Sequence, residues 1–410
     1  MILFVLSSIY TKPFGGVGRS DWSGRLTIAE IFGTLALVTF FFDLIHRKKT
    51  FILPSIIKAY LVFIFFITLE IIPSLNPEQT LIEGVIHIYL GLMFIILINA
   101  FLSKESLNAL ITSFALASLI ASVIGIFNLL MVSIGGTPLL VKQIENPGLA
   151  IGTFNNTGQA GAYMLVVLAV LLPLKFSPLY NHLSPLQKIV INIALITDLA
   201  FLVLTVKLAA YIGFSIGFVL FLVFGILKNR IKIYRFVKSL FLIALISIFA
   251  FLYFKNNVFD WYQWFQYKTL SPQKHNIVIT RLMSNYSQAL RAFEEHPIFG
   301  TGLGGFEKNY HSHEVHSTYL KVFSEAGVLG ALGYALFMFF VIKIFGGIKS
   351  VENEYRAFLD IAIYFFIGCL VSWAYTYHLR KREFWIMLAI LWLSNHFAEQ
   401  EVDENEHYIS

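Results

Sequence analysis

Long apolar runs separated by short polar stretches occupy most of this chain. The clear runs are long enough to cross about 30 Å of hydrocarbon as helices, and they cover residues 26–45, 51–73, 81–102, 106–134, 156–175, 188–206, 208–227, 236–254, 317–345, 357–377 and 383–398. A shorter run over residues 2–10 brings the count to twelve, with eleven as the alternative if that run does not span. The pattern predicts an all-α polytopic membrane protein with about twelve transmembrane helices.

One long polar interruption, residues 255–315, separates the ninth and tenth predicted helices. Apolar residues recur within it at helical spacing, and polar residues recur on another face of the same helix: Leu282, Tyr286, Leu290 and Phe293 on the first face, and Arg281, Asn285 and Gln288 on the second. Pro297 ends this amphipathic helix. The chain then divides into N-terminal helices (1–254), this loop (255–315), C-terminal helices (316–398) and an acidic tail (399–410) that its composition predicts to be disordered and cytoplasmic.

Composition and charge place these helices in a membrane and orient them. The chain is 57% apolar and 13% charged, whereas soluble domains are about a quarter charged. The net charge of +6 therefore reflects basic membrane loops, and we expect no nucleic-acid partner. The basic clusters His46–Lys49, Lys228–Lys238 and Lys343–Arg356 fall on one side, which the positive-inside tendency makes cytoplasmic. The loop 255–315 then lies outside.

Three features qualify this topology. Arg380, Lys381 and Arg382 fall on the outer side, so either the count is off there or these cations are kept outside for a purpose such as phosphate binding. The first ten residues lack a basic n-region and an A-x-A site, so we expect them to remain in the mature protein. The single cysteine, Cys369, excludes a disulfide or a cysteine-based metal site.

Histidines gather where the polar loop meets the next membrane helix. His316 opens that helix, and a neutral imidazole can accept a proton from a sugar hydroxyl near neutral pH. The alternative is a structural histidine that bonds lipid headgroups or the loop. A metal site formed with His311 and His313 is the least favoured reading, because Glu314 is the only obvious carboxylate partner.

Cations near this histidine suggest an anionic ligand. Arg281 and Arg291 lie about 15 Å and 80° apart on one helix, so we do not expect them to grip the same phosphate. An arginine fork suits pyrophosphate oxygens, although headgroup snorkelling is the favoured explanation of these arginines taken alone. Lys207 falls where two apolar runs meet on the outer side, and it either snorkels to the surface or reaches a lipid-linked phosphate.

Glycines and one buried ion pair complete the region. Gly300, Gly302 and Gly305 match G-x-G-x-x-G, but no strand–helix–strand unit surrounds them, which excludes a dinucleotide fold and leaves a loop reversal or a phosphate-facing turn. A second set, Gly327, Gly330 and Gly333, indicates close helix packing. Glu325 at that depth requires a partner, and Lys321 is the simplest one.

These motifs together resemble the O-antigen ligase and polymerase superfamily of bacterial envelope glycosyltransferases. His316-Ser317, nine residues, Gly327, two residues and Gly330 resemble its signature of His followed by Asn, Ser or Gln, nine residues and two glycines. HPIFGTGLGGF and GTFNNTGQAGAYM are similar to two further family segments. The chain departs from the family at one position. In the family a second arginine follows Thr-x-Ser, whereas this chain has Leu208 at that position and Lys207 one residue before it.

The resemblance implies an inverting, metal-independent and cofactor-free transfer of a glycan from undecaprenyl pyrophosphate. The acceptor is a sugar hydroxyl of lipid A–core, at the periplasmic face of the bacterial inner membrane. By position, His316 would be the base, and Arg281 would hold the leaving pyrophosphate, with Lys207, Arg380 and Arg382 as further ligands. We expect His313, Arg291 and Tyr319 to support the acceptor or the loop, and membrane lipids to surround the chain.

Two other functions remain open at this point. An O-antigen or polysaccharide polymerase would extend lipid-linked repeats instead, but a single outer loop of modest size favours a ligase. A transporter of lipid-linked sugars would show paired broken helices and charges near the middle of the membrane. The polar groups here gather at the outer side, which favours chemistry at the surface.

Overall fold

The computed structural model describes residues 1–10, 27–47, 51–137, 139, 149–227, 259–307, 309–346 and 353–409, with scattered positions between 241 and 256. Within these ranges all regular secondary structure is helical, and the one β-bridge joins Glu307 to His311. The helices are α1 (Ile2–Ser7), α2 (Ile28–Arg47), α3 (Ser55–Leu69), α4 (Pro77–Ala100), α5 (Lys104–Ser133), α7 (Thr157–Phe176), η2 (Pro178–His182), α8 (Pro185–Thr205), α9 (Leu208–Leu227), α11 (Phe259–Thr269), α12 (Pro272–Glu295), α13 (Thr318–Lys343), η3 (Ile344–Gly346), α14 (Glu354–Ser372) and α15 (Arg382–Ile409).

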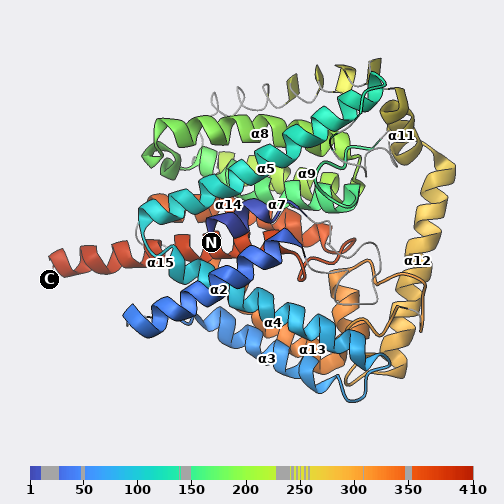
Figure 1. Ribbon diagram of the computed structural model, residues 1–410, viewed down its shortest axis with the longest axis horizontal. Coiled ribbons are helices and arrows are strands. Elements are labelled where there is room, and N and C mark those ends of the chain that lie inside the picture. Colours follow the sequence, from blue (N-terminus) through green and yellow to red (C-terminus); the bar gives the residue numbers. More distant parts are fainter. Residues whose placement is uncertain are drawn as a thin grey trace.

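The apolar helices lie side by side and form a bundle (Figure 1). Its centre is α7, whose most apolar 18-residue window is 89% buried, and α2 lies at the periphery with 11% of its window buried. The contacts of α9 with α14, of α3 with α13 and of α5 with α8 complete the packing. Gly333 allows the α3–α13 contact, since a Cβ there would lie 2.8 Å from the Phe63 Cα. This agrees with the close helix packing predicted for the glycine series.

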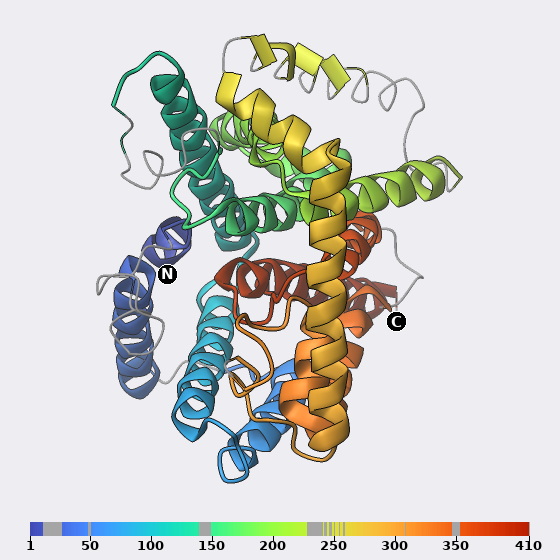
Figure 2. The ribbon, with the colours of Figure 1, turned by 90° about the vertical axis from the view of Figure 1, so that its right-hand side faces the viewer.

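The amphipathic helix predicted before Pro297 is confirmed as α12, and it runs across one end of the bundle (Figure 2). Its buried face, formed by Asn285, Ala289 and Ala292, packs towards α13 and the loop that follows. The connections α3–α4, α8–α9 and α14–α15 lie at this same end. Hydrogen bonds join them to the long loop or to α11, as from the Leu75 N–H to the Thr301 oxygen (3.0 Å) and from the Trp261 indole to the Leu204 oxygen (3.0 Å).

Eight helices in the described part of the chain are long and apolar enough to cross a membrane, and they coincide with eight of the predicted runs. The run over 51–73 gives the shorter α3, and the run over 383–398 is the first part of α15. The run over 2–10 forms only the six residues of α1, too short to span. Most of the run over 236–254 lies outside the described residues. The basic segment Lys228–Lys238 and residues 347–352 of the segment Lys343–Arg356 also lie outside them. The count of twelve is therefore not confirmed.

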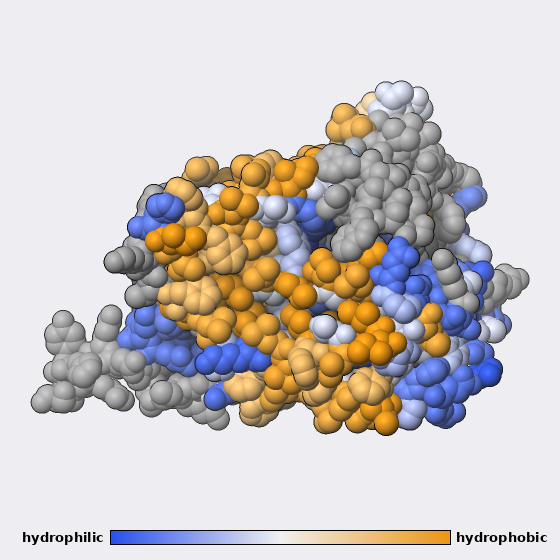
Figure 3. Space-filling model, turned by 60° about the horizontal axis from the view of Figure 1, so that its bottom comes forward, coloured by the Kyte–Doolittle hydropathy of each residue, from blue (hydrophilic) through white to orange (hydrophobic). Residues whose placement is uncertain are grey.

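The prediction of a disordered tail is wrong for the backbone, because α15 continues through the acidic residues to Ile409. That tail ends on the side of the molecule opposite α12 (Figure 1). Apolar surface extends across the middle of the molecule, and polar surface lies at both ends, including the α12 end (Figure 3). The predicted site residues lie at the α12 end.

Candidate functional site

His316 lies at the start of α13, on the end of the bundle that α12 crosses. Ser317 caps the helix, since its side chain accepts a hydrogen bond from the Leu320 N–H at 3.3 Å. The capped turn leaves His316 just outside the helix with an exposed side chain. Thr318 fixes the same turn to the α14–α15 connection through its N–H to the Trp373 oxygen (2.8 Å) and its hydroxyl to the Thr376 oxygen (2.7 Å).

Helix α12 holds the other side of the His316 loop. The His316 N–H donates to Asn285 Oδ1 at 3.1 Å, and Asn285 Nδ2 donates to the Glu314 oxygen at 3.3 Å. Arg281 lies one helical turn before Asn285, exposed to solvent. The two residues that the resemblance placed in catalysis are thus brought to neighbouring elements, although 35 positions separate His316 from Arg281 along the chain.

The turn between α8 and α9 brings Lys207 to the same end. Val206 adopts a left-handed conformation (φ 49°), which reverses the chain between the two helices. The Lys207 side chain then passes over α7 at two glycines: a Cβ on Gly161 would lie 2.9 Å from the Lys207 Cβ, and one on Gly158 would lie 3.5 Å from Nζ. Leu208, at the position of the family's second arginine, is instead 55% exposed. The chain therefore turns the lysine inward and leaves the leucine outside.

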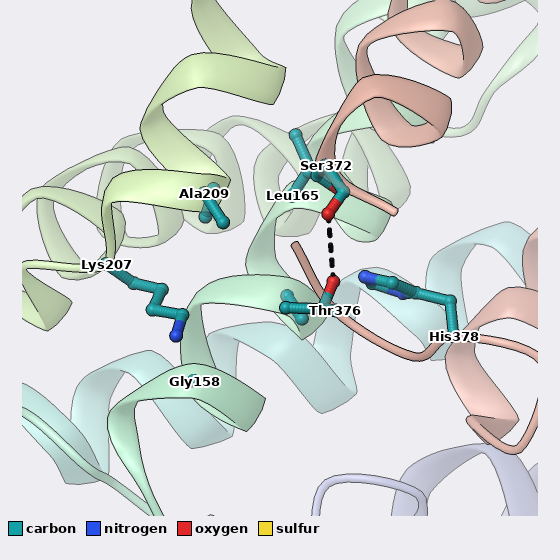
Figure 4. Close-up of a pocket in the computed structure, with 9 residues that line it drawn as sticks. Gly158, Leu165, Lys207, Ala209, Ser372, Thr376 and His378 are labelled. Carbon is teal, nitrogen blue, oxygen red and sulfur yellow. Dashed lines mark hydrogen bonds between the residues drawn. The ribbon is translucent and has the colours of Figure 1, made fainter. Parts of the chain in front are cut away.

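A narrow pocket lies beside Lys207. Its walls come from the start of α7, the α8–α9 turn and the end of α14, and they are formed by Gly158, Ala162, Leu165, Lys207, Ala209, Ala210, Ser372, Thr376 and His378. In Figure 4, Lys207 approaches from one side and the His378 ring from the other, with the Thr376 hydroxyl bonded to the Ser372 oxygen between them (3.1 Å). Because α7 and α9 both begin here, their dipoles add positive potential.

The side chains of Lys207 and His378 in this pocket have no hydrogen-bond partner among the described residues. The Lys207 ammonium makes no hydrogen bond or ion pair there, although the Lys207 backbone oxygen accepts from the Ala210 and Tyr211 N–H groups. Neither ring nitrogen of the fully buried His378 has a partner. Burial, with the nearby Lys381 charge as a second cause, lowers the pKa of Lys207 and holds that of His378 well below its usual range. Buried donors without partners are costly, and an anion in the pocket would satisfy them.

Besides desolvation, the charge of Lys207 is one of the causes that lower the pKa of His316. Desolvation by neighbouring protein atoms is the largest cause that lowers the pKa of His316. Lys207, His313 and His311 lower it further, and the Glu314 carboxylate opposes them. The imidazole is therefore neutral, and able to accept a proton, at a lower pH than an ordinary histidine.

Other cations at this end are already paired. Arg380 bonds Glu83 at 2.6 Å and Glu314 at 3.3 Å, and Lys321 contacts Glu314 at 3.6 Å and Glu325 at 3.3 Å. The predicted Lys321–Glu325 pair is thus confirmed. The other predicted cation of the α14–α15 turn, Arg382, bonds Glu30 at 2.6 Å.

The glycine-rich loop that contains Gly300, Gly302 and Gly305 contacts the Glu325 carboxylate of α13. The Gly304 N–H donates to Glu325 Oε2 at 2.7 Å. Gly327 interrupts α13 with a φ of 60°, and the Pro297 oxygen accepts from the Val328 N–H (2.9 Å) across this break. A Cβ on Gly327 would lie 2.4 Å from the Ile298 oxygen, so only glycine allows this approach. The segment therefore packs into α13, in agreement with the loop reversal.

The remaining predicted residues lie at the edges of the site. Arg291 pairs with Glu295 at 2.8 Å on the exposed surface of α12. The His313 ring lies 5.6 Å from that of His311 and 6.4 Å from that of His316. The Tyr319 hydroxyl donates to the Leu370 oxygen at 2.8 Å and joins α13 to α14.

The segment from α8 to α13 also has a recognisable relative. Residues 193–335 match the family model for O-antigen ligase. The match covers Lys207, Arg281 and His316 and supports the O-antigen ligase superfamily, which confirms the resemblance over that part of the chain. It indicates ligase-type glycosyltransfer in lipopolysaccharide biosynthesis. A comparison with curated proteins finds no match.

Two residues of the site were missed as candidates. Asn285 shares a helical face with Arg281 in the sequence, and that shared face was the available signal. His378 has none, because a histidine in the short link between two apolar runs resembles any headgroup-facing residue. Its unsatisfied nitrogens appear only once the walls of the pocket are assembled.

Proposed function

We propose that this protein transfers a glycan from undecaprenyl pyrophosphate to a sugar hydroxyl of lipid A–core. The reaction takes place at the periplasmic face of the bacterial inner membrane, which we assign to the α12 end of the bundle. The observation that supports this most is the meeting of His316 with the unpartnered Lys207 at one end of the bundle. A base beside a cationic pocket is what an attack with an anionic leaving group requires.

His316 removes the proton from the acceptor hydroxyl. The acceptor oxygen then attacks the anomeric carbon from the face opposite the pyrophosphate, the bond from that carbon to the pyrophosphate oxygen breaks, and the configuration inverts. Negative charge develops on the pyrophosphate as it leaves. Pyrophosphate is already a good leaving group, so positioning, a base and cations suffice.

Lys207 and Arg281 stabilise the leaving group in this proposal. Lys207 substitutes for the second arginine of the family by reaching inward from the α8–α9 turn, and His378 offers a further donor across the pocket. Since a lysine is a point charge and an arginine is a fork, the additional donor compensates for the lost second bond. Arg281 lies on α12, one turn before Asn285.

We assign the other predicted residues weaker or supporting roles in the reaction. Arg380 and Arg382 remain candidates for the pyrophosphate, but their carboxylate partners already occupy them, so we assign them weaker contacts. His313, Arg291 and Tyr319 support the acceptor or the loop. We expect the reaction to need no metal.

The test uses the purified chain in detergent with a lipid-linked glycan and lipid A–core, in the presence of EDTA. We expect transfer to the core, and we expect His316→Ala to lower its rate by about 10²- to 10⁴-fold, as for loss of a general base. Gel mobility of the core and mass spectrometry of the product measure the transfer.

Other products would contradict parts of the proposal. Lengthening of the lipid-linked chain without transfer to the core would identify a polymerase. Movement of lipid-linked sugar across vesicles with no glycosidic product would identify a transporter. Transfer that survives in His316→Ala would remove the base from the mechanism.

A further inference from the structure

The His316 loop is bound by a single buried side chain of α12. Asn285 is 2% exposed, and its amide bonds the backbone on both sides of Val315, accepting from the His316 N–H and donating to the Glu314 oxygen. An amide has one acceptor and one donor group in a fixed plane. It can therefore satisfy both backbone groups, as a neighbouring strand would.

Apolar contacts hold the residue between these two bonds. Val315 is fully buried in a small cluster with Ala289 and Ala292 of α12 and with Phe306. The cluster fixes the distance of the loop from the helix, and the Asn285 bonds fix its direction, because hydrogen bonds are directional where apolar contacts are not. The backbone of His316 thus has a defined orientation relative to α12.

This orientation connects the two halves of the proposed reaction centre. On one side of His316, α12 carries Arg281 one turn from Asn285. On the other side, Thr318 binds the α14–α15 connection at Trp373 and Thr376, next to the wall of the Lys207 pocket. A shift of the loop at Asn285 would move the imidazole relative to both cations at once.

We infer that Asn285 is a positioning residue, which fixes the orientation of the His316 imidazole relative to α12 and the Lys207 pocket. The inference rests on the proposed function. Asn285 contacts the loop backbone and acts on the reaction only through His316. Misplacement of a reacting group by about 1 Å can cost about 10²-fold in rate, so its removal should lower kcat more than it changes the KM for the donor.

The first variant, Asn285→Leu, keeps the branched shape and the number of side-chain heavy atoms and removes both bonds. We expect kcat to fall about 10- to 100-fold, with the donor KM within about twofold of the native value. Gln288→Leu is the matched control: it removes an amide one turn away that bonds nothing in the described part of the chain, and its kcat should stay near native. Thermal melting of each variant in detergent records any loss of fold.

The second variant, Asn285→Asp, distinguishes positioning from stability. The carboxylate keeps the bond from the His316 N–H, loses the bond to the Glu314 oxygen and adds a negative charge near the imidazole. The pKa of His316 should rise, so the acidic limb of the kcat profile should move to higher pH. This shift would show that position 285 lies within electrostatic reach of the imidazole, and the uncharged Asn285→Leu tests positioning without the added charge.

A readout without turnover keeps this inference separate from the proposed function. Diethylpyrocarbonate modifies the neutral imidazole, and fragmentation of the peptide in the mass spectrometer distinguishes His316 from His311 and His313, which lie five and three residues before it. Asn285→Asp should move the pH midpoint of His316 modification upward, and Gln288→Leu should leave it in place. An unchanged midpoint, or a kcat of Asn285→Leu equal to that of the control, would overturn the positioning role. Absence of transfer by the native chain would overturn the proposed function and leave the modification result valid.

Discussion

The α12 end of the molecule contains two sets of basic residues that differ in what their side chains bind. Arg380, Arg382 and Lys321 are paired with carboxylates, and together they connect α2, α4, the long loop, α13 and the α14–α15 turn. The Lys207 ammonium and the neutral His378 ring, in the pocket nearby, have no hydrogen-bond partner in the described ranges. Only the paired set contributes ion pairs to the fold.

Substitutions of the paired residues and of the pocket residues should therefore change different properties of the protein. Breaking a buried ion pair leaves an uncompensated charge and destabilises the fold, so the paired cations should be sensitive in stability. Unpaired polar side chains in a pocket do not stabilise the fold by themselves and are stabilised when an anion binds, so substitutions of Lys207 and His378 should change donor binding. Each variant below tests whether stability and donor use can be separated in this way.

The largest expected effect is on stability, from Arg380→Ala. The substitution leaves Glu83, which is 1% exposed, without its guanidinium partner, and loss of one member of a buried pair costs about 3–5 kcal/mol. Thermal melting in detergent should show a fall of several degrees or more. Arg291→Ala, which breaks the exposed pair with Glu295, should melt like the native chain. Equal melting of the two variants would remove the distinction.

Lys207→Ala should reduce the use of the donor without reducing stability, the reverse of Arg380→Ala. We expect the native melting temperature to be kept or raised and kcat/KM for the lipid-linked donor to fall about 10²-fold, the scale of a lost charge-stabilising contact in a transition state. Lys207→Arg should recover most of the activity, since a guanidinium restores the charge and adds a fork. A loss of folded protein in Lys207→Ala with normal donor use in the remainder would contradict the pocket assignment.

Two histidines allow the same comparison within one residue type, because the ring of His378 has no hydrogen-bond partner in the described ranges and the ring of His87 has two. The test variant is His378→Phe. The phenyl ring keeps the stacking on Trp373, 5.7 Å away, and removes two nitrogens that bond nothing in the protein. The donor KM should rise about tenfold, since a hydrogen bond to a charged group contributes about 1.5–3 kcal/mol. The control is His87→Phe, which loses bonds to Tyr60 (2.7 Å) and Tyr377 (2.9 Å). That variant should melt earlier, and its donor KM should not change.

Sequence patterns predicted the architecture well where helices are long and uniformly apolar. Eight runs reappear as long helices, and the amphipathic α12 ends close to Pro297 as expected. The pattern left open whether residues 2–10 span the membrane, and it failed in the acidic tail. Apolarity over nine residues does not establish a span, and a polar segment that follows a long helix can continue it.

The site was predictable in its members and not in their pairing. His316 and Arg281 followed from motif spacing, and Lys207 from its place between two runs. That Arg380 and Arg382 are occupied by Glu83 and Glu30 depends on contacts between elements about 300–350 positions apart in the sequence. No local pattern contains such contacts.

The smallest expected effect is a shift in the pH dependence of Glu314→Gln. The neutral form of His316 is the base, so the rate rises with pH through the pKa of that imidazole. The Glu314 carboxylate raises this pKa against the lowering effect of burial and of Lys207. Removing the carboxylate should therefore move the acidic limb of kcat to lower pH, and Lys207→Arg should leave it near native. Glu294→Gln, an exposed change on α12, is the control for net charge and should not move the limb. A shift of Glu314→Gln to higher pH would mean that the network of Arg380 and Lys321, rather than direct electrostatics, sets the proton affinity of His316.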